Sequence, residues 1–150
     1  MNGSEKLVTI LMADDDEGDR LLTSDAFADC RLANDLRFVV DGEELMEYLR
    51  REGRFAPPAE APVPGLILLD LNMPRKSGFE ALAEIKADPQ LRRIPVVILT
   101  TSKAEEDLVR SYVEGASSFI TKPVSFAGLV EVVKGLGRYW FEIVDLPPPV

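Results

Sequence analysis

The sequence predicts an α/β protein whose five strands form one parallel, doubly wound sheet with helices on both faces. Three observations support this prediction. Five short apolar segments alternate with stretches whose apolar residues recur at helical spacing. Each stretch is long enough for a right-handed crossover between parallel strands. Acidic, threonine or lysine residues directly follow four of the apolar segments, as expected where the carboxyl ends of strands form a ligand-binding edge.

The amino-terminal half contains two strand–helix units and a long loop. An apolar run, VTILMA, ends abruptly in three acids, which is typical of a strand buried on both faces. Leu45, Met46 and Leu49 share one face of the second helix. The proline-rich loop that follows cannot continue that helix. The expected boundaries are strand 8–13, helix 17–30, strand 36–40, a turn at Asp41-Gly42, helix 43–52 and loop 53–65.

The carboxyl-terminal half contains three more units. The run LILL at 66–69 is the most hydrophobic segment and is expected to be a central strand. Asp88-Pro89 ends the third helix, because a residue before proline avoids the α region. Ser125 is expected to cap the last helix. One side of that helix is apolar and carries Leu129, Val132, Val133, Leu136 and Tyr139 or Trp140. The remaining boundaries are helix 77–87, strand 95–99, helix 104–114 and strand 118–121.

Composition and charge restrict the class of protein. A length of 150 residues suits one domain, and 46% hydrophobic with 29% charged residues is ordinary for a globular protein. The net charge of -9 disfavours nucleic acid as a partner. Because histidine is absent and Cys30 is the single cysteine, zinc sites are disfavoured and Ser-His triads and internal disulfides are excluded. We expect no membrane association and a cytoplasmic location, since neither a bilayer-spanning stretch nor a signal peptide is evident.

The acids that follow the strands predict a site for a hard divalent cation. Asp14, Asp15 and Asp16 follow the first strand, and Asp70 follows the third. Like charges gathered at one sheet edge oppose ionisation, so a cation is expected between them. Mg²⁺ (or Mn²⁺) fits best because it prefers oxygen ligands. Asp16 has a simpler alternative role as the cap of the first helix.

The same edge carries groups suited to phosphoryl transfer. A carboxylate such as that of Asp70 can act as a nucleophile toward a metal-bound phosphoryl donor. Lys122 supplies a positive charge and Thr100 a hydroxyl for phosphoryl oxygens, and the neighbouring Thr101 is an alternative to Thr100. Catalysis would then consist of positioning and charge neutralisation.

Four motifs occur in register along the chain. They are Asp14-Asp15 after the first strand, LILLDLNMP around Asp70, Thr100 after the fourth strand and Lys122-Pro123 after the fifth, over roughly residues 7–135. This arrangement resembles the response-regulator receiver family of two-component signalling. The resemblance implies a flavodoxin-like (βα)5 fold with strand order 2-1-3-4-5. The expected organisation is one receiver domain over 1–150, with tails at 1–6 and 147–150, an inserted loop at 53–65, a last helix with an apolar tail at 125–146, and no output domain.

The resemblance assigns metal-binding roles. Asp70 would be the phosphoacceptor and, together with Asp15, a direct Mg²⁺ ligand. The backbone carbonyl of Asn72 would be another ligand, and Asp14 would act through a water molecule.

The resemblance also assigns contacts and movements. Thr100 and Lys122 would contact the phosphoryl group. In the family, that threonine and an aromatic residue on the fifth strand change position together on phosphorylation, and Phe119 occupies the aromatic position. A plain core role is the alternative for Phe119. The Lys122-Pro123 peptide bond would be cis.

Four longer segments make the resemblance to one group of receiver domains more specific. They are EGDR at 17–20, the proline-containing loop, LTTSKAEEDL at 99–108 and YWFEIVDLP at 139–147. They are similar to single-domain regulators that work with bacterial phytochromes or related sensor kinases, so a sensor histidine kinase is the implied partner. In that subfamily the last helix and its tail form homodimers, which here implicates Tyr139, Trp140, Phe141, Ile143 and Val144. Alternatively, the apolar tail folds back on its own domain.

The sequence therefore predicts a phosphorylation switch that signals through protein contacts. We expect it not to be an enzyme, but a phosphoacceptor that catalyses its own phosphotransfer and dephosphorylation. One alternative is a magnesium-dependent phosphohydrolase, but Asp70 is followed by Leu71-Asn72 and not by the DxD pattern of that class. A second alternative is a pseudo-receiver that works by docking alone, and the filled phosphorylation positions argue against it.

Overall fold

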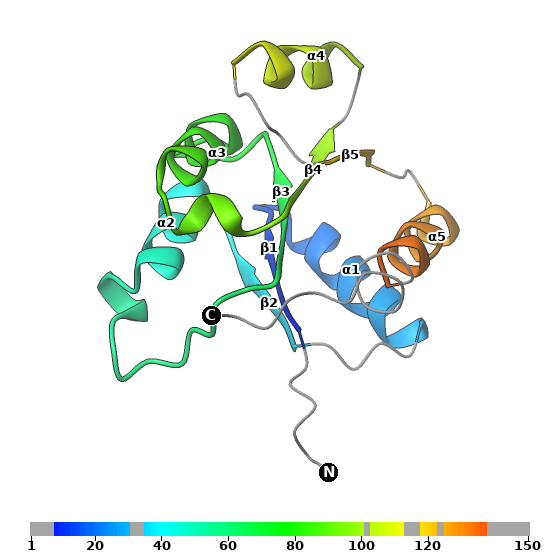
Figure 1. The fold of residues 1–150 in the computed structure, drawn as a ribbon. Helices are drawn as coiled ribbons and strands as arrows, with labels where there is room; N and C mark the ends of the chain where they lie inside the picture. Colours follow the sequence, from blue (N-terminus) through cyan, green and yellow to red (C-terminus); the bar gives the residue numbers. More distant parts are fainter. Residues whose placement is uncertain (1–7, 31–34, 101–102, 113–117, 123–124, 138–150) are drawn as a thin grey trace.

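The computed structural model describes residues 8–30, 35–100, 103–112, 118–122 and 125–137. They form a five-stranded sheet of order β2-β1-β3-β4-β5 in which all neighbouring strands are parallel (Figure 1). The predicted α/β class and the strand order implied by the resemblance are both confirmed. The strands are β1 (Thr9–Ala13), β2 (Asp35–Val39), β3 (Leu66–Asp70), β4 (Val96–Thr100) and β5 (Ser118–Thr121).

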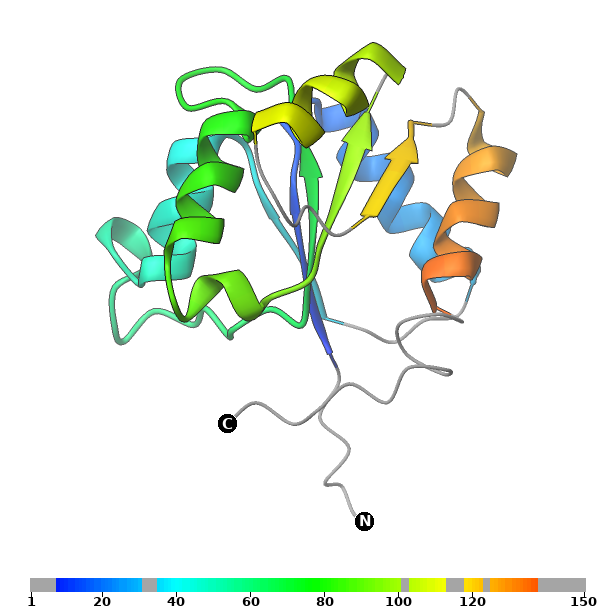
Figure 2. The same ribbon diagram turned by 45° about the horizontal axis from the view of Figure 1, so that its top comes forward.

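Helices cover both faces of the sheet. α1 and α5 lie on one face and α2 and α3 on the other (Figures 1 and 2), and α4 joins the second group because its buried Val109 packs into the same core. Of the helices among the described residues, none has both the length and the apolar composition needed to cross a bilayer. The helices are α1 (Glu17–Asp29), α2 (Gly42–Arg50), α3 (Gly78–Ala87), α4 (Lys103–Tyr112) and α5 (Phe126–Gly137), with short 3-10 helices at Gly53–Phe55 and Leu91–Arg93.

Strand residues alternate between two apolar cores, because successive side chains of a strand point to opposite faces. On β1, Leu11 and Ala13 belong to the core under α2, α3 and α4. Ile10 and Met12 belong to the core under α1 and α5. The same alternation recurs on β3 and β4. β3 lies in the middle of the sheet and is buried along its whole length, which confirms its predicted central position.

Side chains that accept hydrogen bonds from backbone N–H groups fix where the helices begin. Asp16 caps α1 by accepting from the N–H of Asp19 at 2.9 Å, so the simpler alternative for this acid is confirmed. Ser77 and Glu80 form a capping box at the start of α3. The hydroxyl of Ser125 accepts a 3.1 Å hydrogen bond from the first turn of α5, as predicted.

The predicted boundaries differ from the observed ones by one or two residues at several ends. The clearest error is at Asp41-Gly42, which was expected to be a turn. The carboxylate of Asp41 instead accepts from the N–H of Glu44 at 2.7 Å, so that α2 begins at Gly42. Asp70 belongs to β3 rather than following it, because it still pairs with Leu99 of β4.

The loop at 53–65 is attached to the domain more firmly than its composition predicts. The guanidinium of Arg51 donates to three of its backbone carbonyls. The hydroxyl of Tyr48 donates to the carbonyl of Pro62 at 2.8 Å, and Ala61 is buried. The loop therefore packs along α2, because its carbonyl groups are bound by side chains of that helix and of its carboxyl-terminal cap.

Candidate functional site

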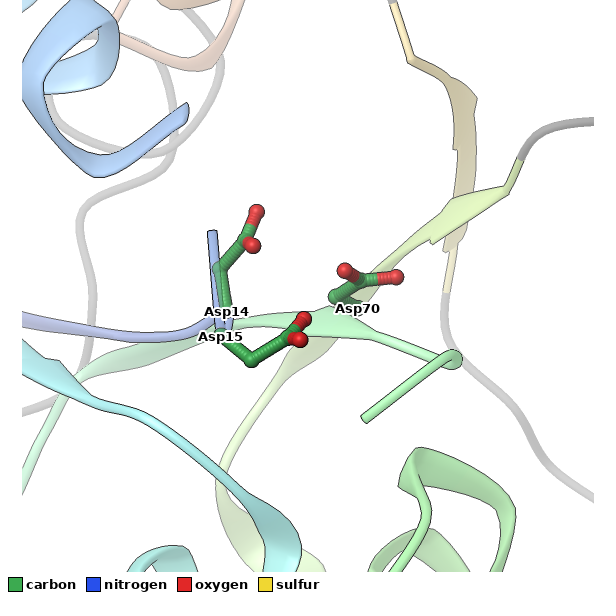
Figure 3. Close-up of side chains that lie close together, drawn as sticks. All are labelled: Asp14, Asp15 and Asp70. Carbon is green, nitrogen blue, oxygen red and sulfur yellow. The ribbon is translucent and has the colours of Figure 1, made fainter. Parts of the chain in front are cut away.

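Three carboxylates meet at the carboxyl ends of two neighbouring strands. Asp14 and Asp15 follow β1, and Asp70 is the last residue of β3. The two strands pair in parallel up to Ala13 and Leu69, so that the acids emerge side by side. One oxygen of each carboxylate lies within 4.8 Å of the others, and Figure 3 shows the three side chains together. The acids expected at one edge of the sheet therefore do lie in one cluster.

Asp14 is fully buried, and only one of its two carboxylate oxygens accepts a hydrogen bond from the described residues. Its Oδ1 accepts from the backbone N–H of Asp16 at 2.9 Å. Its Oδ2 accepts no hydrogen bond from the described part of the chain, although Lys122 Nζ lies 3.3 Å away. Burial is the main cause that raises the pKa of Asp14 from 3.8 to about 6, while the hydrogen bond from Asp16 and the charge of Lys122 oppose the rise. Asp14 is thus a buried acid with one carboxylate oxygen that accepts no hydrogen bond from the described residues.

Asp70 is held by hydrogen bonds to both of its carboxylate oxygens. The backbone N–H of Asn72 donates to Oδ1 at 3.1 Å, and Lys122 Nζ donates to Oδ2 at 3.0 Å. Burial raises the pKa of Asp70, and these two hydrogen bonds partly offset the effect. The start of α3 packs closely against the main chain of Asp70, because a Cβ added at Gly78 would lie only 2.3 Å from the Asp70 backbone oxygen.

Lys122, the first residue after β5, joins the acids of β1 and β3. Burial alone would lower the pKa of Lys122, but its hydrogen bonds to Asp19 and Asp70 and the charge of Asp14 raise it above the usual value. The lysine is therefore charged at neutral pH. Its ammonium group lies inside the acid cluster, as expected from the position of Lys122 in the sequence.

Asp19 is a member of the cluster that the sequence did not reveal. It lies in the first turn of α1, and its Oδ2 accepts from Lys122 Nζ at 2.8 Å. The only sequence signal was its position three residues after the helix cap Asp16, and such a position usually serves the helix itself.

The cluster fits a hard divalent cation. All of its donors are carboxylate oxygens, Asp15 is exposed to solvent, and the buried Oδ2 of Asp14 has no hydrogen bond among the described residues. Mg²⁺ and Mn²⁺ take oxygen ligands and commonly retain several water molecules, which an open site of this kind allows. The single charge of Lys122 cannot balance the carboxylates of Asp14, Asp15 and Asp70, and a dication between them would offset much of the remaining negative charge.

The structure describes some of the other residues expected in the site and not the rest. Asn72 lies beside Asp70, and its side-chain amide donates to Glu105 of α4 at 3.2 Å. Phe119 on β5 is half-buried and packs against the core under α2, α3 and α4. Thr100 ends β4, but its side chain lies outside the described part of the structure. Pro123 with its peptide bond, and the tail residues Tyr139, Trp140, Phe141, Ile143 and Val144, also lie outside the described residues.

The fold and the acid–lysine cluster together define a receiver domain. Residues 10–134 match the response regulator receiver domain, and the chain belongs to this family.

Individual relatives show which members of the family this chain resembles. Response regulator Rcp1 of Synechocystis sp. is 39% identical over 138 residues, which is 92% of this chain and 92% of that protein. The crystal structure of the Mn²⁺-bound form of Rcp1 has a TM-score of 0.82 and 38% identity, and covers 94% of this chain and 99% of that chain. The phosphorylated cyanobacterial phytochrome response regulator RcpA has a TM-score of 0.84 and 42% identity, and covers 95% of this chain and 100% of that chain. The predicted resemblance to phytochrome-associated regulators is confirmed.

One expectation is wrong. The chain was expected not to be an enzyme, although catalysis of its own phosphotransfer and dephosphorylation was assigned to it. The chain belongs to the receiver domains, which are phosphoacceptors with autophosphatase activity. The physical reason is that charges which stabilise transfer of a phosphoryl group onto an aspartate also stabilise its transfer onward to water.

Proposed function

We propose that this protein is a stand-alone response regulator that accepts a phosphoryl group on Asp70 from a sensor histidine kinase. The observation that carries the proposal is the arrangement around Asp70. The carboxylates of Asp14 and Asp15 lie beside it, and Lys122 Nζ lies 3.0 Å from its Oδ2. The relative RcpA has a phosphorylated form, which supports the same chemistry here.

The proposed metal site is built from oxygen atoms of four residues. Asp15 and Asp70 would bind Mg²⁺ (or Mn²⁺) directly, the backbone carbonyl of Asn72 would be a further ligand, and Asp14 would act through water. This assignment is supported by the mutual approach of the three carboxylates and by Asp14 Oδ2, which accepts no hydrogen bond within the described part of the chain. When bound, the cation would neutralise charge on the carboxylates and on a phosphoryl oxygen. The relative Rcp1 has a Mn²⁺-bound form.

In the proposed transfer, an oxygen of Asp70 forms a bond to phosphorus while the P–N bond of the donor phosphohistidine breaks. The departing imidazole nitrogen takes a proton from solvent. Lys122 and the hydroxyl of Thr100 would donate hydrogen bonds to phosphoryl oxygens. The present hydrogen bond from Lys122 to Asp70 supports the role of the lysine, because a phosphoryl group on Asp70 would lie within reach of the same ammonium.

Phosphorylation is proposed to shift an equilibrium between two conformations. Thr100 and Phe119 would change position together when the phosphoryl group is added. The half-buried position of Phe119 beside the core under α4 supports this role. The hydrogen bond between Asn72 and Glu105 offers a second link between the site and α4.

The proposed partners are a kinase and a second copy of the chain. A bacteriophytochrome or a related sensor kinase is the proposed phosphoryl donor, because RcpA is a phytochrome response regulator. A homodimer through the last helix and the apolar tail is supported by the composition of that tail. Its proposed contacts are Tyr139, Trp140, Phe141, Ile143 and Val144. A cytoplasmic location is proposed, since the single cysteine gives no disulfide framework.

The test is incubation with Mg²⁺ and acetyl phosphate followed by intact mass measurement. We expect the wild type to gain an adduct of about 80 Da. The adduct should not form when EDTA is added before acetyl phosphate, and it should not form on Asp70→Asn. Asp25→Asn is the matched control, because Asp25 is an exposed aspartate on α1, away from the cluster, and this variant should be modified like the wild type. A wild type that acquires no adduct, or an adduct that persists in Asp70→Asn, would refute the proposal.

A further inference from the structure

The shortest contact of the Lys122 ammonium is not with the proposed phosphoacceptor. Lys122 Nζ lies 2.8 Å from Asp19, 3.0 Å from Asp70 and 3.3 Å from Asp14. Asp19 is 103 positions away in the sequence and lies on α1, whereas Lys122 follows β5 at the far side of the sheet. The contact therefore bridges the first helix and the last strand across the site.

Asp19 is well suited to hold the lysine, because its own backbone is fixed. The N–H of Asp19 donates to the cap residue Asp16 at 2.9 Å, and its carbonyl accepts from the hydroxyl of Thr23 at 2.8 Å. Thr23 is buried in turn. A lysine side chain, in contrast, has four rotatable bonds and loses substantial conformational entropy when it is held in one position.

We propose that Asp19 is a positioning residue that holds the Lys122 ammonium beside the carboxylates of Asp14 and Asp70, ready to donate to a phosphoryl group on Asp70. The inference rests on the proposed function and deepens it. An ammonium group has three hydrogens to donate. One donated to Asp19 leaves the others for Asp70 and for oxygens bound to it, so that the anchor and the phosphoryl group do not compete for the same hydrogen.

Asp19 is not a further ligand of the cation in this arrangement. The carboxylates close enough to share an ion among the described residues are those of Asp14, Asp15 and Asp70. The carboxylate of Asp19 is instead directed to the lysine. Its contribution to phosphorylation is therefore expected to pass mainly through Lys122, and removal of the lysine should remove most of it.

The first test measures the affinity for beryllofluoride, a phosphoryl mimic, by calorimetry in saturating Mg²⁺. We expect Asp19→Asn to weaken binding by roughly three- to tenfold, as for one charge-assisted hydrogen bond of a half-exposed pair. Asp19→Glu, which keeps the charge, should recover part of the affinity, and Asp25→Asn should bind like the wild type. In a Lys122→Gln background, the change Asp19→Asn should have little further effect.

The second test observes the lysine directly in the metal-free protein. The ¹⁵N ammonium signal of Lys122, assigned by its loss in Lys122→Gln, is expected in the wild type and in Asp25→Asn, because hydrogen bonds slow its exchange with water. It should be shifted or broadened in Asp19→Asn. Urea unfolding of Asp19→Asn is measured in parallel and should remain cooperative. If Asp19 had only a structural role, the ammonium signal of Lys122 would be unchanged in a variant that still folds.

Several results would overturn the inference. One is that Asp19→Asn binds beryllofluoride as tightly as the wild type or more tightly. Another is that Asp19→Asn weakens this binding by the same factor in the Lys122→Gln background as in the wild type. A third is an unchanged ammonium signal of Lys122 in Asp19→Asn. If the wild type itself fails to bind beryllofluoride, the proposed function is refuted. If the wild type binds and Asp19→Asn binds equally well, only the role of Asp19 is refuted.

Discussion

Lowering the pH from about 7.5 to about 5 in the presence of EDTA is expected to stabilise the metal-free protein against urea, through Asp14. The pKa of this buried acid is 3.8 in the unfolded chain and about 6 in the folded protein. An acid whose folded pKa is raised destabilises the native state above that pKa, where it must be ionised while buried. The penalty decreases as the pH falls through 6 and is absent below 3.8, where both states are protonated.

The expected magnitude follows from these two pKa values. Proton linkage for one group of this kind gives a gain of about 1.4 kcal/mol in the free energy of unfolding at about pH 5, relative to about pH 7.5. Asp70 adds a contribution of the same sign, because burial raises its pKa as well. Bound Mg²⁺ should reverse the trend, since protons then compete with the cation for the same carboxylates.

The assay is urea unfolding followed by circular dichroism at several pH values, with Asp14→Asn as the control. Asparagine cannot ionise, so this variant should lack most of the gain, and the difference between the two curves isolates Asp14 from the ordinary surface acids. Parallel curves for the wild type and Asp14→Asn between about pH 7.5 and about pH 5 would refute the reasoning. A larger gain in the variant would refute it equally.

Two further substitutions test how the site and the long loop are supported. Gly78→Ala should cost about 1–3 kcal/mol in urea unfolding, because the new Cβ would meet the backbone of Asp70 at 2.3 Å, and it should also weaken Mg²⁺ binding measured by calorimetry. If Gly78→Ala left the free energy of unfolding unchanged, α3 would be able to move away from the Asp70 backbone at no cost. Tyr48→Phe should cost about 1 kcal/mol through loss of the hydrogen bond to Pro62, with faster proteolysis of the loop, and unchanged proteolysis would argue against this anchor.

The central features of the fold could be predicted from the sequence because they depend on local patterns. β3 is buried on both faces and therefore appears as an unbroken apolar run, LILL, that leads into Asp70. Ser77 and Glu80 form a capping box at the expected start of α3, because this motif involves residues only three positions apart. The cap role of Asp41 was not predictable, since an Asp-Gly pair is equally compatible with a turn and with the cap of a helix.

The candidate site was partly predictable for a related reason. In a parallel sheet the residues after the strands share one edge, so that a one-dimensional list of strand ends already collects Asp14, Asp70 and Lys122. The burial of Asp14 and Asp70, and the lack of a hydrogen bond from any described residue to Asp14 Oδ2, were not predictable, because both depend on how the strands pack beneath the helices.

By itself the sequence determined the order of elements, the central strand and the acidic edge, because periodicity and strand ends are written along the chain. Only the tertiary structure decided that Asp19 holds Lys122 and that Arg51 binds the long loop. Those contacts depend on the positions of α1 and α2 against the sheet. The packing of the two apolar cores determines these positions, and no local sequence pattern does.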